Sequence, residues 1–211
     1  MLSDFVSEHR DELIVRCAAM VALRPHRDAT PDQLRNGIPL FLRQLHQTLL
    51  ADQGGRALES LRLSGGPGGE HSELSEIGSG ASEHGRQLSI LGYTVDQVVH
   101  DYGDLCQVIT EVAIEMDASI RVHEFSTLNR CLDNAIAVAV AAFSKERDAD
   151  DLSAGVLGAA ECHELKNCLA TASYAARALE IGNLPMSGAT GSILKKSLAA
   201  MRRSLDGNDA G

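Results

Sequence analysis

The sequence predicts an all-α protein. Its 211 residues are 44% apolar but only 3% aromatic, with no Trp, so the core must be built from Leu, Ile, Val and Ala, a composition that favours helices over sheets. Over long stretches apolar residues recur at alternating steps of three and four, the period of an amphipathic helix, and no strand-like alternation of any length is present. A chain of this length can bury a sizeable core in one large domain or two small ones.

Two helices of about five turns each are expected in the first fifty residues. Residues 5–23 and 32–50 both carry apolar side chains at helical spacing, and Pro31 suits the first turn of the second helix. The stretch 54–69 contains the run GGPGG and interrupts this pattern. Because the GGPGG run lacks the GK[ST] of a phosphate-binding loop, we expect this run to be a flexible linker between helices.

The middle of the chain carries its two most regular apolar stripes. The first continues from Leu88 to Val112 as a heptad stripe without a break. The second runs from Phe125 to Ala142, and its small residues should let a neighbouring helix approach closely. We therefore expect residues 1–150 to form a helical bundle and a long helix around residues 121–157 to lead out of it.

A helical hairpin is expected over residues 151–211. The two apolar stripes, separated by a Gly- and Pro-rich break at 181–191, comprise Leu165, Leu169, Ala172, Ala176 and Leu179, then Leu194, Leu198, Met201 and Leu205. One short hairpin cannot cover both stripes, so we expect a homodimer in which two hairpins form a four-helix bundle. At 100° per residue, His163 points away from the first stripe, and its face is shared by Asn167, Ala170, Tyr174 and Arg177.

Charge and cysteine usage exclude several classes of protein. The net charge is −10, which argues against a nucleic-acid or anionic-membrane partner, although residues 163–211 are net +2 and residues 1–162 carry −12. The acidic N-terminus is unlike a signal peptide, and the longest uncharged apolar run, 135–143, is too short to span a membrane. Five scattered Cys with no CxxC predict a reduced, cytoplasmic protein.

The motif HELKN at 163–167 resembles the H-box of two-component sensor histidine kinases. The family pattern is His-Glu-apolar-Arg/Lys-Asn/Thr-Pro-Leu, and six of its seven positions match through Leu169, with Cys168 where the family has Pro. The resemblance covers about 50 residues, because the second helix, which starts at Thr190-Gly191, is similar to the return helix of the dimerisation and phosphoacceptor hairpin. More loosely, residues 1–150 resemble the all-helical, globin-like sensory modules of the bacterial stress pathway, in GYTVDQVVHDYGDL and EFSTLNRCLDNAIA.

The resemblance implies a role for each residue of the motif. His163 would be the phosphoacceptor, because a neutral imidazole can attack the γ-phosphorus of ATP through one ring nitrogen. Glu164 would hold the other ring N–H and accept its proton, and Asn167 would orient a water for removal of phosphate from a docked partner. That partner is the receiver domain of a response regulator, whose aspartate takes the phosphate. Its docking face on the hairpin would comprise Lys166, Ala170, Tyr174 and Arg177.

In this family ATP is held by a further domain with an Asn-rich box and the glycine motifs DxGxG and GxGLG. No such motifs follow before Gly211, so we expect ATP to be supplied by an ATP-binding kinase domain in cis or in trans. The chain is then the sensor and phosphoacceptor portion of a histidine kinase. The alternatives are a free-standing dimeric histidine phosphotransfer protein and a non-catalytic stress-sensor scaffold.

Several of the candidate residues also have a simpler structural interpretation. HELKN by itself also suits a solvated helix face, since Glu, Lys and Asn are common there. His100 would suit a haem or metal ligand in a globin-like sensor, but no His or Cys follows at i+3 or i+4, so we expect a surface histidine and no metal site. Cys162 and Cys168 point to different faces and are interpreted as packing residues. The sensory ligand and the input signal are not predicted.

Overall fold

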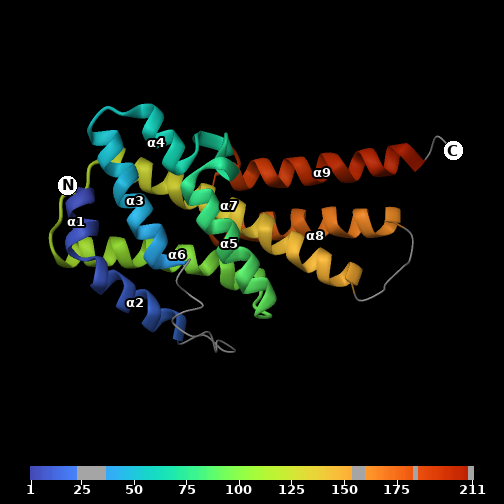
Figure 1. The fold of residues 1–211 in the computed structure, drawn as a ribbon, viewed down its shortest axis with the longest axis horizontal. Helices are drawn as coiled ribbons and strands as arrows, with labels where there is room; N and C mark the ends of the chain where they lie inside the picture. The colour runs from blue at the N-terminus through green and yellow to red at the C-terminus, as the bar shows by residue number, and fades with distance from the viewer. Residues whose placement is uncertain (23–36, 154–159, 183–184, 209–211) are drawn as a thin grey trace.

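The computed structural model describes the backbone of residues 1–22, 37–153, 160–182 and 185–208, and the side chains within these ranges except at 148–153, 160–166, 181 and 203–208. All regular structure in the described residues is helical, with nine α-helices, two 3₁₀ turns and no strand (Figure 1). The all-α prediction is confirmed. None of the helices within these ranges combines the length and the apolar character that a membrane span requires.

The first four helices are α1 (Leu2–Glu8), α2 (Arg10–Ala22), α3 (Ile38–Gln53) and α4 (Ala57–Ser64). A single helix over residues 5–23 was the wrong prediction, because the chain turns at His9, whose N–H bonds the carbonyl oxygen of Phe5 at 3.0 Å. The turn lets Phe5 of α1 and Leu13 of α2 both lie in the core. Pro39 lies in the first turn of α3, as is usual for proline. Pro31 lies outside the described residues.

The heptad stripe that begins at Leu88 is divided between two helices, α5 (Glu76–Ile90) and α6 (Val95–Glu115). The Thr94 side chain accepts a hydrogen bond from the N–H of Gln97, and the Gln97 side chain accepts one from the N–H of Thr94, which makes a capping box at the start of α6. The prediction of an unbroken stripe was therefore wrong. Leu88 and Val112, at its two ends, are nevertheless both buried in one core.

Helix α7 (Val122–Ser153) passes through the centre of the molecule, with α5 across it (Figure 1). The two helices are closest where Gly85 faces Ala139, since a Cβ on Gly85 would overlap the Ala139 carbonyl. Four residues of the second stripe are buried on α7, namely Leu128, Leu132, Ala135 and Ala139. Close approach of a neighbouring helix to this small-residue stripe is confirmed. The expected domain boundary after residue 150 lies inside α7, and the division into two domains stays a prediction.

The GGPGG run is folded against α7. It contributes η1 (Pro67–Gly69), which is followed by η2 (Ser72–Leu74). The side-chain amide of Asn134 on α7 donates to the carbonyl oxygens of Ser64 and Gly66, at 2.7 and 3.1 Å. The flexible linker was therefore a wrong prediction, because a buried side chain of a distant helix satisfies the backbone of this segment.

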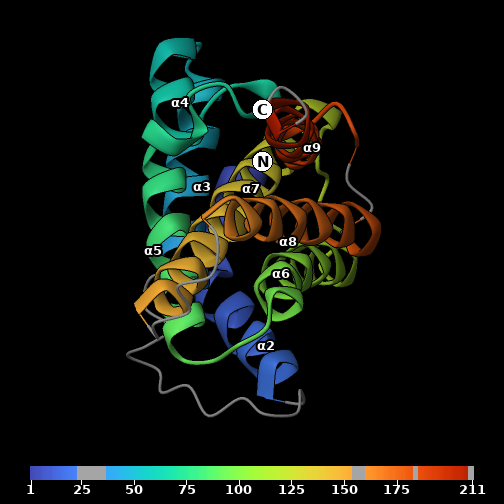
Figure 2. The ribbon, with the colours of Figure 1, turned by 90° about the vertical axis from the view of Figure 1, so that its right-hand side faces the viewer.

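The last two helices, α8 (Ala160–Ile181) and α9 (Ala189–Asn208), run in opposite directions and form the expected hairpin. Figure 2 looks along α9, while α8 runs across the view. The hairpin lies on the bundle: α8 contacts α6 and α7, and α9 contacts α7 and η1. The first turns of α8 lie at the end of the molecule farthest from α1 (Figure 1).

Candidate functional site

The residues of the HELKN motif lie in the first turns of α8. His163, Glu164 and Lys166 belong to the helix, but their side chains lie outside the described part of the structure. Asn167 is the first candidate whose side chain is described, and it is half-buried. The helix continues through Cys168, as expected where no proline interrupts the backbone hydrogen bonds.

The docking face is partly in contact with the helices of the bundle. Tyr174 is half-buried, and its ring and that of Phe143 on α7 form a T-shaped pair with the ring centres 6.3 Å apart. The Arg177 guanidinium donates two hydrogen bonds to the carboxylate of Asp96 on α6, at 2.8 and 2.7 Å. Ala170 is half-buried. The expectation of a solvent-facing line is therefore wrong for Tyr174, because α7 covers one side of its ring.

The buried face of α8 differs from the predicted apolar stripe. Ala172 and Leu179 are buried as expected, but Ala175 and Ala178 are buried as well. Leu169 of the stripe is 58% exposed. The reason is that the small side chains at 172, 175 and 178 let α8 lie close to the other helices of its own chain. The Leu169 side of the stripe is left facing solvent.

Helix α9 also carries apolar side chains that its own chain does not cover. Leu198 is 49% exposed, and Leu194 and Met201 are half-buried. The side chain of Leu205 lies outside the described residues. Each helix of the hairpin thus presents at least one leucine of its predicted stripe to solvent.

The turn of the hairpin is held by Asp133 of α7. Its buried carboxylate accepts hydrogen bonds from the N–H of Ala189 at 2.7 Å and from the N–H and hydroxyl of Thr190 at 3.4 and 3.1 Å. Backbone N–H groups at a helix start have no partner within the helix, so a carboxylate from elsewhere in the chain satisfies them. Gly188 permits this approach, since a Cβ there would overlap the Asp133 carboxylate.

Asp133, Asp96 and Phe143 are the contact residues that sequence reasoning missed. A signal existed for Asp133, because a carboxylate directly after Leu132 and next to the uncharged apolar run 135–143 needs a buried partner. Its partner lies 56 positions further along the chain, and no periodicity links the two. Asp96 and Arg177 are separated by 81 positions.

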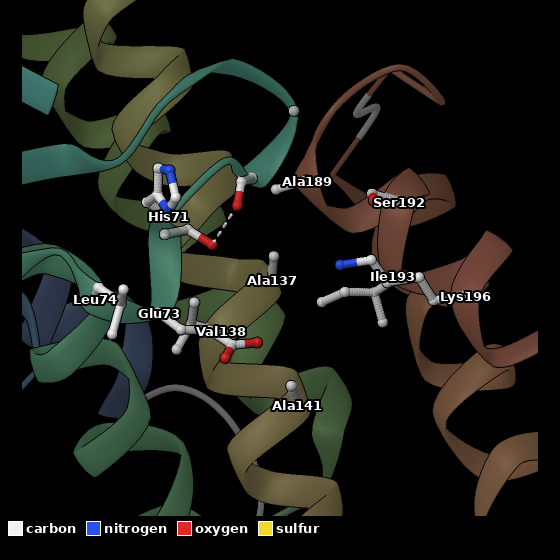
Figure 3. Close-up of a pocket in the computed structure, with 13 residues that line it drawn as sticks. His71, Glu73, Leu74, Ala137, Val138, Ala141, Ala189, Ser192, Ile193 and Lys196 are labelled. Carbon is white, nitrogen blue, oxygen red and sulfur yellow. Dashed lines mark hydrogen bonds between the residues drawn. The ribbon is translucent and has the colours of Figure 1, made fainter.

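A cavity of about 260 Å³ lies between α9, α7 and the segment of η1 and η2. In Figure 3, Ala137 and Ala141 of α7 face Ile193 and Lys196 of α9 across this cavity. On the η1–η2 side, the Ser72 hydroxyl donates to the Gly69 carbonyl at 3.0 Å. None of the candidate site residues lines the cavity. The cavity affects how the hairpin packs on the bundle. Beyond the first turn of α9, it separates this helix from part of α7.

The buried polar groups elsewhere in the bundle include one close pair of titratable side chains. Among the described residues, no three His, Cys, Asp or Glu side chains converge as metal ligands. His84 and Asp101 form a buried pair with Nε2 and Oδ2 3.3 Å apart. Burial raises the pKa of the Cys17 and Cys131 thiols to about 12, so both stay protonated and unreactive near neutral pH. His100 is half-buried on α6.

Comparison of the chain with family models, with curated proteins and with solved structures found no match. What the site can do must therefore be inferred from the residues that form it. The described part offers an amide at Asn167, an aromatic ring at Tyr174 and a guanidinium at Arg177, all on α8. These groups can bind a protein surface, and the candidate residues 163 and 164 lie on the same helix, about one to four turns before them.

Proposed function

We propose that this chain is the sensor and phosphoacceptor portion of a two-component histidine kinase, with His163 as the phosphoacceptor. The observation that carries the proposal is the position of HELKN, which opens the first helix of a helical hairpin that follows an all-α bundle. The resemblance to the H-box family requires this order of elements. ATP is supplied by an ATP-binding kinase domain, in cis or in trans.

The proposed reaction transfers the γ-phosphoryl group of ATP to the His163 imidazole. A ring nitrogen attacks the γ-phosphorus, the bond to the β,γ-bridging oxygen breaks, and ADP leaves with that oxygen. The ring then carries a positive charge until the proton on its other nitrogen passes to Glu164. The phosphoryl group next passes to an aspartate of the receiver domain, which binds the docking face.

The test is incubation with ATP and the separately expressed ATP-binding domain of a histidine kinase, followed by mapping of acid-labile phosphate. We expect phosphate on His163 and none in His163→Gln, because an amide is not a nucleophile. His100→Gln, a control on α6, should accept phosphate normally. Phosphate on His163→Gln, or none on the wild-type protein, would contradict the proposal, and the second result would favour the scaffold alternative.

Glu164 and Asn167 have separate roles in this proposal. Glu164→Ala should slow phosphorylation by about 10²- to 10⁴-fold without changing the final occupancy, the usual contribution of a general base. Asn167→Ala should leave phosphorylation intact and slow the removal of phosphate from the receiver domain. Equal loss of all activities in both variants would show instead that the hairpin has unfolded, and circular dichroism distinguishes the two cases.

The proposed protein is a homodimer in which a second copy covers the exposed leucines of the hairpin. Leu169 and Leu198 are 58% and 49% exposed, and apolar groups of this size favour burial in a four-helix bundle. Leu169→Glu should give a monomer by light scattering at micromolar concentration. Leu58→Glu, at an 85% exposed position on α4, is the matched control and should stay dimeric. A monomeric wild-type protein would contradict the proposed dimer.

A cytoplasmic location is part of the proposal. The four cysteines whose side chains are described, Cys17, Cys106, Cys131 and Cys168, have free thiols, as is usual in a reducing compartment. Fractionation of cells that express the protein from its own promoter tests this location. Recovery from the periplasm or the medium would contradict it.

A further inference from the structure

Two residues of the docking face are bound by the bundle of their own chain. Arg177 makes a bidentate contact with Asp96 near the start of α6, and the Tyr174 ring forms a T-shaped pair with Phe143 of α7. Two parallel hydrogen bonds from a guanidinium to a carboxylate are the strongest form of such a pair. The same two side chains are those that the proposed function assigns to receiver binding.

The two polar contacts that join the hairpin to the bundle, at Asp133 and at Asp96, differ in burial. At the turn, Asp133 is buried and its carboxylate accepts hydrogen bonds from two residues at the start of α9. On α8, Asp96 and Arg177 have side chains 34% and 58% exposed. An exposed pair is weakened by water and salt, whereas a buried one is weakened far less. The contact on α8 is therefore the easier of the two to break.

Beyond the turn, a cavity interrupts the packing of α9 against α7. The cavity between α7 and α9 begins at Ala189 and extends to Lys196 on α9. The cavity removes part of the contact between α9 and α7. The hairpin can thus keep its attachment at Asp133 when the Arg177–Asp96 pair opens. Full separation of α8 from the bundle also exposes the buried side chains of Ala175 and Ala178.

We propose that the bundle and the receiver domain compete for one surface of α8, so that the arrangement in this structure is an autoinhibited one. In it, Arg177 is bound by Asp96 of α6 and Tyr174 packs against Phe143 of α7, so separation of α8 from both helices exposes the two side chains to the receiver domain. A signal that moves α8 relative to α6 and α7 therefore controls phosphate transfer through access to this surface. The inference rests on the proposed function.

The test compares Asp96→Asn with Asp96→Glu in the full chain. Asn removes the charge that binds Arg177, whereas Glu keeps it, so only Asp96→Asn should release α8. Hydrogen exchange of the amides of residues 170–181 should then be faster by about 1.5- to 5-fold, the change expected for loss of one exposed ion pair. Glu83→Gln, which removes an exposed ion pair with Arg86 within α5, is the matched control and should leave exchange in α8 unchanged.

Phosphate transfer is measured on the same variants. The receiver domains of the source organism are first tested for phosphate transfer from the wild-type protein. The one that takes phosphate fastest is then the probe. Asp96→Asn should transfer phosphate about 1.5- to 5-fold faster than wild type at low salt. At 0.5 M salt the difference should shrink, because salt screens the wild-type pair as well. Asp96→Glu and Glu83→Gln should match wild type.

The outcomes separate this inference from the proposed function. Faster exchange with unchanged or slower transfer in Asp96→Asn would overturn the competition, as would unchanged exchange in α8. A wild-type protein that takes no phosphate at His163 would overturn the proposed function and the competition together. Normal phosphorylation of His163 with no effect of Asp96→Asn would overturn the competition alone.

Discussion

The Asp133 carboxylate holds the turn of the hairpin on α7. Asp133→Ala should therefore strongly lower the free energy of unfolding. The substitution removes an acceptor that binds two backbone N–H groups and one hydroxyl at the start of α9. Loss of a helix cap costs about 0.5–2 kcal/mol, and loss of a hydrogen bond to a charged group costs about 1.5–3 kcal/mol. Because the two figures partly describe the same contact, we expect a loss of about 2–3 kcal/mol.

The assay for Asp133→Ala is urea unfolding followed by circular dichroism, together with hydrogen exchange in α9. The free energy of unfolding should fall by the amount given above, or, if α9 separates locally, its amides should exchange faster without a global change. Asp11→Ala, at an exposed acid in the first turn of α2, is the control and should change stability by less than about 0.5 kcal/mol. A similarly small effect of Asp133→Ala, with unchanged exchange in α9, would refute the reasoning.

Three further predictions concern the bundle. Gly85→Ala should lower the free energy of unfolding by about 1–3 kcal/mol, because the new methyl group overlaps the backbone of α7. Gly103→Ala in α6 should raise it by about 0.5–1 kcal/mol, because the new Cβ meets no described atom within 4 Å apart from its chain neighbours and the backbone of its own helix. Equal effects of the two substitutions in thermal melts would contradict both. Burial raises the pKa of Glu124, but the N–H groups of Arg121 and Leu2 and the Arg121 guanidinium together lower it below its ordinary value of 4.5. Its stabilising effect is therefore present above that value and is lost as the pH falls through the lower folded-state pKa, so Glu124→Gln should flatten the acid limb of a stability–pH curve, and an unchanged limb would count against this contact. Cys17 and Cys131 are buried with raised pKa values, and should react with a thiol reagent only after unfolding; labelling of either in the native protein at neutral pH would contradict their burial.

Helical periodicity predicted most of the fold but not where helices end. The 3.6-residue period correctly predicted the helical class, the small-residue stripe of α7 and the C-terminal hairpin. The break after Ile90 was readable in the sequence, since Thr94 and Gln97 have the spacing of a capping box. The break at His9 has no such signal, because it depends on the core that α1 and α2 share.

The candidate chemistry was likewise predictable only in part. The HELKN motif at 163–167 and its place at the start of a hairpin follow from local sequence, because residue order and helical period are local properties. Which face of α8 is covered is not local. The predicted stripe at Leu169 faces solvent while Tyr174 contacts α7, since the small side chains of α8 fit against helices far away in the sequence.

By itself the sequence determined the helical class, the hairpin and the order of its candidate reacting groups. Only the tertiary structure decided that Asp133 binds the start of α9 and that Asp96 binds Arg177. The physical reason is that a helical period fixes which residues share a face, but not which other helix that face meets. That choice depends on the shape and charge of surfaces that come together only when the whole chain folds.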